Sequence, residues 1–371
     1  MTLQTVVFRA DASIDIGTGH VMRCLTLAAA LRDVGAQCVF VSRDHPGNLV
    51  ELIREHGFEA IALPRSDTEP SLLDDEGLPE HSHWLGTTWQ ADARETLGVL
   101  AERRFDWLVV DHYALDVRWE SELRQTCERL MVIDDLADRP HDCDLLLDQN
   151  IGRQGSDYEG LVPPAACLLL GPRYALLRPE FAALRDSALG RRVPGPIGQI
   201  FVSMGGVDKY NLTRRVIDEL KVFDFPTGCR LLIIMGRDAP RLQEIREAAV
   251  QMPVPTDVQN EVANMAQLML DSDLAVGAAG GTALEQCCMG LPSIFIIAAE
   301  NQRRGARALR LSGSALVIDK AEEITRELPR AVTKMLDNKQ RHEFSQKCQS
   351  VTDGKGCQRT VEKMMGSHGR P

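Results

Sequence analysis

Two glycines followed by a histidine, Gly17, Gly19 and His20, are the residues near the start of the chain best suited to chemistry. Glycines let the backbone approach a ligand closely, and a helix beginning here directs its free N–H groups and its positive dipole end to the same place. That dipole disfavours imidazolium, so a histidine there stays neutral more easily and can act as a general base. The pattern predicts His20 as a catalytic base; the alternative is that His20 only begins the helix.

The same loop argues against two nucleotide-binding motifs. No Gly-Lys-Ser/Thr sequence follows, as a Walker A motif requires, and no glycine after Gly19 completes a G-x-G-x-x-G pattern. A nucleotide-triphosphate motor and a standard dinucleotide enzyme are both disfavoured.

A second small-residue loop combines Gly280, Gly281 and Thr282 with Glu285 one turn further along. Small residues admit a diphosphate to a helix N-terminus, and a carboxylate there can accept hydrogen bonds from two ribose hydroxyls. Spacing alone also allows Glu285 to be an ordinary helix-face glutamate.

Gly205 and Gly206 follow another expected strand, at residues 199–204. This loop has the size of a phosphate-binding nest. The alternative is a tight turn between a strand and a helix.

Polar residues also follow several other expected strands. Asp111, His112 and Tyr113 follow one strand, and Asp134 and Asp135 follow the next. Carboxylates with a histidine can hold a metal, but these acids come from separate loops without ligand spacing, which favours capping or contacts with substrate hydroxyls. Further candidates are Asn150, Asn301 and Gln302, which ordinary loop polarity would also explain.

Short apolar runs that alternate with helical patterns must position these residues. Strands are expected at residues 5–10, 38–41, 60–63, 107–111, 130–135 and 145–148, and again at 199–204, 229–235, 254–259, 274–276 and 293–297. Continuous apolar strands alternating with helices are typical of a parallel, doubly wound sheet. The predicted fold class is α/β, with two Rossmann-like domains facing across a cleft, where such sheets bind ligands at their carboxyl ends.

A Gly-, Pro- and Arg-rich stretch at residues 189–196 interrupts the alternation and predicts the domain boundary. We expect an N-terminal domain at 1–190 that carries His20 and a C-terminal nucleotide-binding domain at 191–340. A helical tail at 341–371 is expected to pack back on the N-terminal domain.

Composition excludes several other classes of protein. The 371 residues carry a net charge of −11 and only 5% aromatic residues, which argues against a nucleic-acid-binding surface. No apolar run approaches the roughly 20 residues of a membrane span, and no signal peptide precedes the first strand. None of the ten cysteines forms a C-x-x-C pair, so we expect buried thiols in a reducing, cytoplasmic setting.

Several strings together resemble one known family: residues 9–13, 16–25, 110–113, 133–136 and 260–265. They are similar to the UDP-2,4-diacetamido-2,4,6-trideoxy-β-L-altropyranose hydrolases of pseudaminic acid biosynthesis, a family also found in spore-coat polysaccharide clusters. The resemblance runs from about residue 6 to residue 302 and implies the two-domain GT-B architecture. Two positions depart from the family pattern: Leu284, where tryptophan is frequent, and Asp148, where asparagine is common.

The resemblance also implies roles for individual residues. His20 corresponds to the family's proposed base, and Asp11 and Tyr113 lie in its shared strings. Asn260, in another shared string, is a further substrate-binding candidate. Similarity to the related peptidoglycan N-acetylglucosaminyltransferase implies that the uracil lies near Val262 and Met265. The same similarity implies diphosphate at residues 280–282 and ribose at Glu285.

The predicted enzyme is a UDP-sugar hydrolase in which water replaces UDP at the anomeric carbon with inversion. Diphosphate is already a good leaving group, so it needs stabilisation by N–H dipoles more than a general acid, and one histidine suffices as base. We expect a monomer acting on a small UDP-sugar for glycan biosynthesis such as flagellin glycosylation, with no cofactor and no metal. The alternatives are a GT-B glycosyltransferase that uses an acceptor and a UDP-sugar-binding protein without turnover.

Overall fold

The computed structural model describes residues 4–65, 77–101, 103–237, 239–260 and 262–366. The chain forms two compact units. The first comprises Met1–Leu176 and Cys357–Pro371, and the second comprises Leu177–Gly356.

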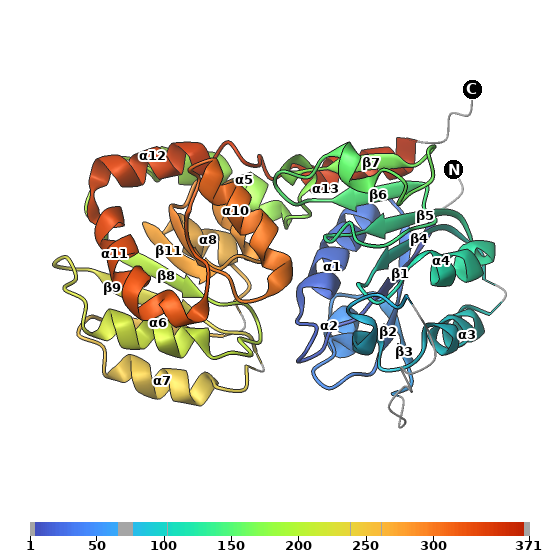
Figure 1. The fold of residues 1–371 in the computed structure, drawn as a ribbon, viewed down its shortest axis with the longest axis horizontal. Helices are drawn as coiled ribbons and strands as arrows, with labels where there is room; N and C mark the ends of the chain where they lie inside the picture. Colours follow the sequence, from blue (N-terminus) through green and yellow to red (C-terminus); the bar gives the residue numbers. More distant parts are fainter. Residues whose placement is uncertain (1–3, 66–76, 102, 238, 261, 367–371) are drawn as a thin grey trace. The chain divides into compact units, whose positions relative to one another are not determined.

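The first unit is built on a parallel sheet of seven strands in the order β3-β2-β1-β4-β5-β6-β7 (Figure 1). The strands are β1 (Thr5–Ala10), β2 (Gln37–Arg43), β3 (Glu59–Leu63), β4 (Phe105–Asp111), β5 (Cys127–Ile133), β6 (Leu145–Asp148) and β7 (Cys167–Leu170). The strand order reverses between β1 and β4, and doubly wound sheets bind ligands beside such a switch point.

Helices cover both faces of this sheet. Alternate side chains of β1 enter different cores: Val6 and Phe8 enter one, and Val7 enters the other. The first core is completed by α1 (Gly19–Asp33), α2 (Val50–Glu55) and α13 (Gly356–Met365), and the second by α3 (Trp89–Leu100) and α4 (Val117–Leu123). Burial on both faces explains why the strands read as continuous apolar runs. Short 3-10 turns are η2 (Ser82–Leu85), η3 (Arg124–Thr126), η4 (Gly155–Tyr158) and η5 (Pro172–Tyr174).

The second unit repeats the plan with six parallel strands in the order β10-β9-β8-β11-β12-β13. The strands are β8 (Gln199–Ser203), β9 (Arg230–Ile234), β10 (Thr256–Gln259), β11 (Leu274–Ala278), β12 (Ser293–Ile296) and β13 (Leu316–Ile318). Here the strand order reverses between β8 and β11. The carboxyl ends of these two strands therefore mark the second predicted binding edge.

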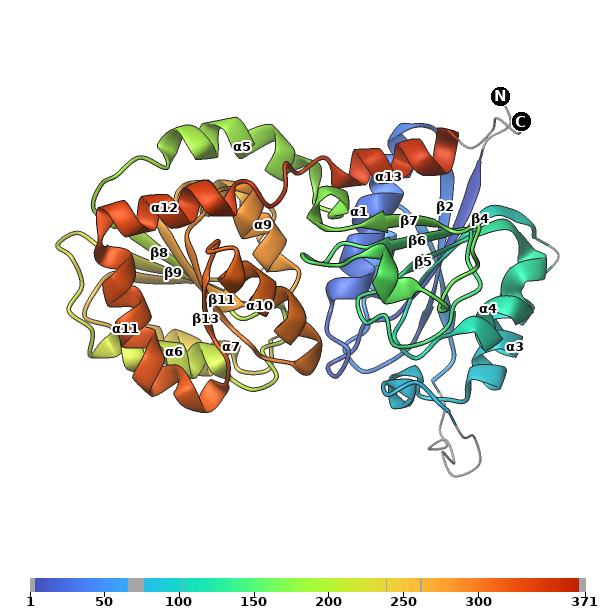
Figure 2. The same cartoon turned by 45° about the horizontal axis from the view of Figure 1, so that its top comes forward.

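Helices also surround the second sheet (Figure 2). One face is covered by α6 (Leu212–Lys221), α7 (Leu242–Val250) and α11 (Ile324–Leu336), which share a core with the sheet. The other helices and turns are α5 (Pro179–Arg191), α8 (Met265–Leu270), α9 (Thr282–Cys288), α10 (Arg303–Leu311), α12 (Asn338–Cys348), η6 (Glu300–Gln302) and η7 (Ala321–Glu323). Among them, α5 packs on α8 and α9.

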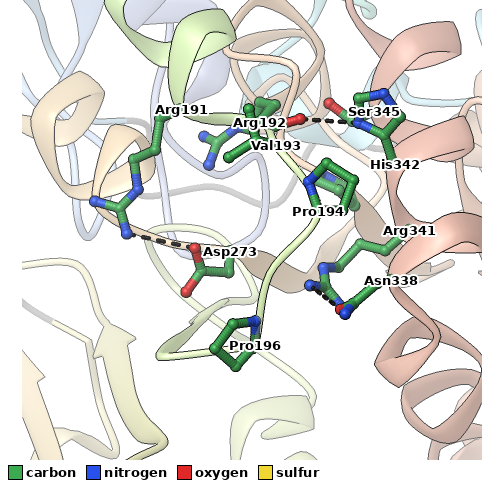
Figure 3. A pocket seen from close by; sticks show the side chains of 11 residues that line it. Arg191, Arg192, Val193, Pro194, Pro196, Asp273, Asn338, Arg341, His342 and Ser345 are labelled. Atoms are coloured by element: carbon green, nitrogen blue, oxygen red, sulfur yellow. Dashed lines mark hydrogen bonds and ion pairs between the residues drawn. The ribbon is translucent and has the colours of Figure 1, made fainter.

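The observed division of the chain lies before α5, whereas the Gly- and Pro-rich stretch predicted it after that helix. Arg192, which follows α5, explains the difference. Its guanidinium donates to the carbonyls of Met269, Ser272 and Met289 at 2.8, 2.5 and 3.1 Å, at the C-terminal ends of α8 and α9. Burial lowers the pKa of Arg192 to about 10, so it remains a cation where helix dipoles favour one. Figure 3 shows this stretch within the second unit.

The tail beyond residue 340 is divided between the two units. Helix α12 belongs to the second unit, where the Ser345 hydroxyl donates to the Gly290 carbonyl at 2.7 Å. Helix α13 belongs to the first unit, where Cys357, Val361 and Met364 enter the core beside α1. The tail is therefore no separate domain, and only α13 packs on the first unit's core.

Most predicted elements are present, with differences where apolar patterns are weak. The pattern of residues 117–129 predicts one helix, but helix α4 ends at Leu123. There the Thr126 hydroxyl donates to the Leu123 carbonyl at 2.7 Å, and η3 leads directly into β5. The sequence reading also missed α5, α10, β7 and β13. Helix α10 is Arg-rich and buries only Ala306 and Leu309, so its pattern is faint. In the part of the chain that the structure describes, no helix has the length and apolarity needed to cross a membrane.

Candidate active site

His20 stands at the beginning of α1, directly beside the switch point of the first sheet. Gly17, at a φ of +82°, closes the preceding loop by donating to the Ser13 carbonyl at 2.8 Å. The imidazole Nδ1 of His20 lies 2.6 Å from Oδ1 of Asp111, the last residue of β4. Because a carboxylate only accepts, Nδ1 carries a proton, and in the neutral form of the ring the lone pair is therefore on Nε2. Among the described residues, Nε2 has no hydrogen-bond partner.

Asp111 is held from its other side by Arg23, one turn into α1. Arg23 Nε lies 2.6 Å from Asp111 Oδ2, and Nη2 lies 2.7 Å from Oδ1. Burial by itself raises the pKa of Asp111, but Arg23 and His20 outweigh burial and hold that pKa well below its usual range. Asp111 is therefore a carboxylate that can orient His20.

A second carboxylate, Asp135, extends this network along the sheet edge. Arg23 Nη1 lies 2.7 Å from Asp135 Oδ2, and the Tyr113 hydroxyl donates to the same oxygen at 2.6 Å. Asn150, two residues after β6, donates to Asp135 Oδ1 at 3.0 Å. The structure thus brings three predicted site residues, His20, Tyr113 and Asn150, into one network. The sequence singled out Asp111 and Asp135 as polar residues at strand ends but did not predict their link to His20, and Arg23, which joins them, was not considered as a site residue.

Asp11, in contrast, lies in the interior. It is fully buried, and its Oδ1 accepts from Arg9 at 2.5 Å and from the Arg43 backbone at 2.7 Å. Its Oδ2 faces His112 Nε2 at 3.2 Å. His112 Nδ1 accepts from the Ala114 N–H at 3.0 Å, so the ring proton sits on Nε2, toward Asp11. Since no oxygen of Asp11 reaches the surface, it positions other residues and does not offer a group to substrate.

The carboxylates for which the sequence left metal binding open form ion pairs and hydrogen bonds instead. Asp111 and Asp135 share Arg23. Asp134 lies 3.0 Å from Arg139 Nη1 and accepts from the Tyr158 hydroxyl at 2.9 Å. Within the described ranges, no group of three or more His, Cys, Asp or Glu side chains is arranged to hold a metal ion.

Two ring-bearing residues near the site, His81 and Trp84, were not among the predicted site residues. The Tyr113 ring lies edge-on to His20, with ring centres 4.5 Å apart. Trp84 stacks on Tyr113 at 5.6 Å and 22°, and His81 stacks on Trp84 at 4.4 Å. Burial lowers the pKa of His81. The spacing of residues 81 and 84 was the available signal, because residues three apart share one side of a 3-10 turn.

In the second unit, the loop after β11 leads into α9 through Gly280 and Gly281. Gly281 is the N-cap of α9 and has no side chain with which to cap the first N–H groups. Glu285 lies one turn further on, 18% exposed, with Oε1 3.4 Å from Arg178 Nη2. Burial raises the pKa of Glu285, whereas Arg178 opposes that rise. Glu285 is thus a largely buried carboxylate rather than an ordinary surface glutamate.

The loops after β11 and β12 meet at Gly280. A Cβ at Gly280 would lie 3.5 Å from Gln302 Nε2, so the Gln302 side chain lies over this glycine. Gln302 Oε1 accepts from the Ala298 N–H at 3.0 Å, which fixes the side chain. Asn301 beside it is exposed. The structure therefore brings Gln302 to the small-residue loop.

The contacts of Gly205 and Gly206 agree with the second alternative stated above, a tight turn between a strand and a helix. Gly205 has a φ of +93°, and a Cβ at Gly236 would lie 2.0 Å from the Gly206 carbonyl oxygen. Asp208 caps the following helix by accepting from the N–H groups of Leu212 and Thr213 at 2.8 and 2.9 Å. The N-terminus of α6 is thus occupied by the protein's own carboxylate.

The residues expected near uracil lie at the carboxyl end of β10 and the start of α8. Asn260 Oδ1 accepts from Arg246 Nη2 at 3.0 Å. Val262 and Met265 are half-buried, and Glu261 lies outside the described residues. Strands β9 and β8 separate β10 from β11, so this group lies along the same sheet edge as Gly280 without contacting it.

Two pockets of the second unit contain none of these predicted residues. The one drawn in Figure 3 measures about 30 Å³ and lies between the stretch after α5 and α12. The other, of about 360 Å³, lies beside η6 and is lined by Glu300 and Arg303, which flank Asn301 and Gln302.

Two parallel-sheet Rossmann-like units of this kind define the fold class of the GT-B glycosyltransferases. Solved structures agree. Acinetobacter baumannii MurG superposes with a TM-score of 0.69 at 14% identity, covering 98% of this chain and 99% of that one. A UDP-glucosyltransferase from Polygonum tinctorium gives a TM-score of 0.65 at 13% identity, covering 98% and 99%. At such identities the likeness establishes the fold alone.

Sequence comparisons are more specific. Residues 200–359 match the Glycosyltransferase family 28 C-terminal domain. The chain is 27% identical over 310 residues to the UDP-2,4-diacetamido-2,4,6-trideoxy-beta-L-altropyranose hydrolase of Campylobacter jejuni, covering 83% of this chain and 97% of that protein. It is also 26% identical over 146 residues to the spore coat polysaccharide biosynthesis protein SpsG of Bacillus subtilis, covering 39% and 42%. The resemblance predicted from the motifs is confirmed.

Proposed function

We propose that this chain hydrolyses a UDP-linked 2,4-diacetamido-2,4,6-trideoxy sugar at its anomeric C–O bond with inversion. UDP and the free sugar are released, the latter for pseudaminic acid biosynthesis. The observation that carries the chemistry is the His20–Asp111 pair, with Nδ1 and Oδ1 2.6 Å apart. The similarity to the Campylobacter hydrolase over nearly its whole length supports an enzyme acting on a nucleotide sugar.

His20 acts as general base through Nε2. A water oxygen forms a bond to the anomeric carbon while one water proton passes to Nε2, and the bond from that carbon to the diphosphate oxygen breaks with its electron pair leaving on UDP. Asp111 holds the Nδ1 proton, fixes the tautomer and stabilises the imidazolium that forms. A single displacement of this kind inverts the anomeric centre.

The second unit would hold the leaving group. The uncapped start of α9 after Gly280 and Gly281 suits a diphosphate, and Glu285 suits the ribose hydroxyls. Uracil would lie near Asn260, Val262 and Met265, at the carboxyl end of the edge strand. Stabilising a diphosphate by N–H dipoles removes the need for the second carboxyl group that ordinary glycosidases use.

We further propose that the protein is a monomer acting in the cytoplasm, where nucleotide sugars are made. Its ten cysteines are unpaired, and nine of them are buried, which suits a reducing compartment.

The test is to incubate the protein with the UDP-sugar alone and to follow UDP and free sugar. Wild-type protein should turn over without any acceptor, and His20→Asn should lose about 10²–10⁴-fold in kcat. His56→Asn, an exposed histidine on the same unit, is the matched control and should keep wild-type activity. An active His20→Asn protein would disprove the role of His20.

The fold favours one other function, transfer of the sugar to an acceptor, because the solved relatives are glycosyltransferases. Turnover that begins only when an acceptor is added would support that function over hydrolysis. Tight UDP binding without any turnover would instead indicate a binding protein.

A further inference from the structure

The aromatic residues beside Tyr113 are not used by the mechanism above. Trp84 lies in the turn η2 and His81 is its N-cap, and their rings stack with centres 4.4 Å apart. Trp84 also stacks on Tyr113 at 5.6 Å, and Tyr113 in turn touches His20. Trp84 therefore lies one ring beyond Tyr113 from the proposed base.

The turn that carries these rings is fixed at both ends. Ser82 N–H donates to the Pro79 carbonyl and Trp84 N–H to the His81 carbonyl, both at 2.9 Å. Leu85 is buried in the core, and Gly86, at a φ of +69°, packs so closely on His45 that a Cβ would lie 2.8 Å from His45 Cε1. Since residues three apart share one side of a 3-10 turn, His81 and Trp84 must face Tyr113 together.

The surroundings of His20 are thus of two kinds. Asp135 and Asn150 form a polar side, at which the Tyr113 hydroxyl ends. His81 and Trp84 form an aromatic side and remain half-buried, whereas Tyr113 beneath them is only 4% exposed. Partly exposed rings beside a polar group suit an amphipathic ligand whose apolar groups lie on the rings.

We propose that His81 and Trp84 form the wall of the sugar subsite and determine specificity. In this arrangement the rings contact the methyl groups of an acylated, deoxygenated amino sugar, while hydroxyl and amide groups face Asp135 and Asn150. The inference rests on the proposed function. It adds that the aromatic side, His81 and Trp84, contacts the apolar groups of the sugar. A hydroxylated hexosamine would have to leave a hydroxyl group desolvated against the rings, which is unfavourable.

The test compares Trp84→Leu, Trp84→Phe and the control His83→Ala on two substrates. His83 belongs to the same turn but is exposed. The substrates are the UDP-diacetamido-trideoxy sugar and UDP-N-acetylglucosamine. Trp84→Leu should raise KM for the deoxy sugar about tenfold and reduce its preference over UDP-N-acetylglucosamine, because the ring face is lost. Trp84→Phe should stay within about threefold of wild type. His83→Ala should match wild type.

Binding of UDP alone separates a sugar-specific effect from a general one. Its Kd should not change in Trp84→Leu, because the nucleotide is assigned to the second unit. Wild-type KM and wild-type preference in Trp84→Leu would overturn the proposal, as would an equal loss of affinity for UDP. If Trp84→Leu does not fold, His81→Ala replaces it, with the same expected direction and the same contradicting result.

The inference and the proposed function can fail separately. If wild-type protein turns over no UDP-sugar, the proposed function fails. The contact of His81 and Trp84 with the sugar is then tested by comparing the Kd of the intact UDP-sugar with the Kd of UDP. A Kd for the UDP-sugar that is unchanged by Trp84→Leu would overturn the inference. If wild-type protein hydrolyses the substrate and Trp84→Leu is indistinguishable from it, only the inference fails.

Discussion

Nδ1 of His20 lies 2.6 Å from Oδ1 of Asp111, joining the first helix of the chain to the end of the fourth strand. Arg23 holds the same carboxylate through two nitrogens. His20 therefore keeps one tautomer and one orientation, which a general base requires.

Asp111→Asn should lower kcat about 10²–10⁴-fold with little change in UDP affinity, because an amide does not hold the Nδ1 proton or stabilise the imidazolium. Steady-state kinetics and UDP titration measure both. The control is Asp106→Asn on the same strand, where the carboxylate binds only Thr5 in the described structure; its kcat should stay at the wild-type value. Wild-type kcat in Asp111→Asn would show that the pair is structural only.

Acid should destabilise the first unit through its buried carboxylates. Burial alone raises the pKa values of Asp111 and Asp134, but Arg23 and Arg139 respectively outweigh it and hold both pKa values below the usual range. A carboxyl with a depressed folded-state pKa stabilises the fold fully above its unfolded pKa of about 3.9, and this contribution is lost as pH falls below that value. Urea unfolding at pH 7 and at pH 3 should show the loss.

Asp134→Asn should cost about 3 kcal/mol at pH 7 and clearly less at pH 3. At pH 3 the aspartate of the unfolded chain is largely protonated whereas folded Asp134 is still ionised, so the ion pair contributes less to the free energy of unfolding. The control is Asp138→Asn, a half-exposed partner of the same Arg139, which should cost under about 1 kcal/mol. If Asp134→Asn lowered the free energy of unfolding equally at both pH values, the claim that Asp134 is an ionised, stabilising carboxylate would be contradicted.

Arg192→Met should destabilise the second unit by about 3 kcal/mol, because three helix-end carbonyls lose a charged donor. Denaturant unfolding of the full chain checks this. Arg191→Met is the matched control. Arg191 is 40% exposed and pairs with Asp271 and Asp273, so its loss should cost under about 1 kcal/mol. Equal costs for the two variants would mean that Arg192 does not anchor α5.

Glu285→Gln should weaken UDP binding about tenfold, since a neutral amide accepts more weakly from two ribose hydroxyls. Isothermal titration with UDP measures the change. Glu180→Gln removes the other carboxylate that pairs with Arg178 and should leave the Kd unchanged. The same Kd in wild type and Glu285→Gln would exclude Glu285 from the ribose site.

Local strings were enough to predict most strands of both sheets, the helix that His20 begins and the small-residue loop at Gly280. They could not reveal that Asp111 and Arg23 hold His20, because that pairing depends on which strands become neighbours. They also suggested Asp11 as a contact, although the sheet places it in the interior with Arg9. Trp84 escaped notice because its position against Tyr113 depends on how η2 folds onto the sheet edge.

Hydrolysis in ¹⁸O-labelled water, analysed by mass spectrometry, tests the central claim most directly. Attack of a His20-activated water on the anomeric carbon predicts one ¹⁸O atom in the free sugar and none in UDP, with product formation lost in His20→Asn. Label in UDP would contradict cleavage of the anomeric C–O bond and the mechanism built on it.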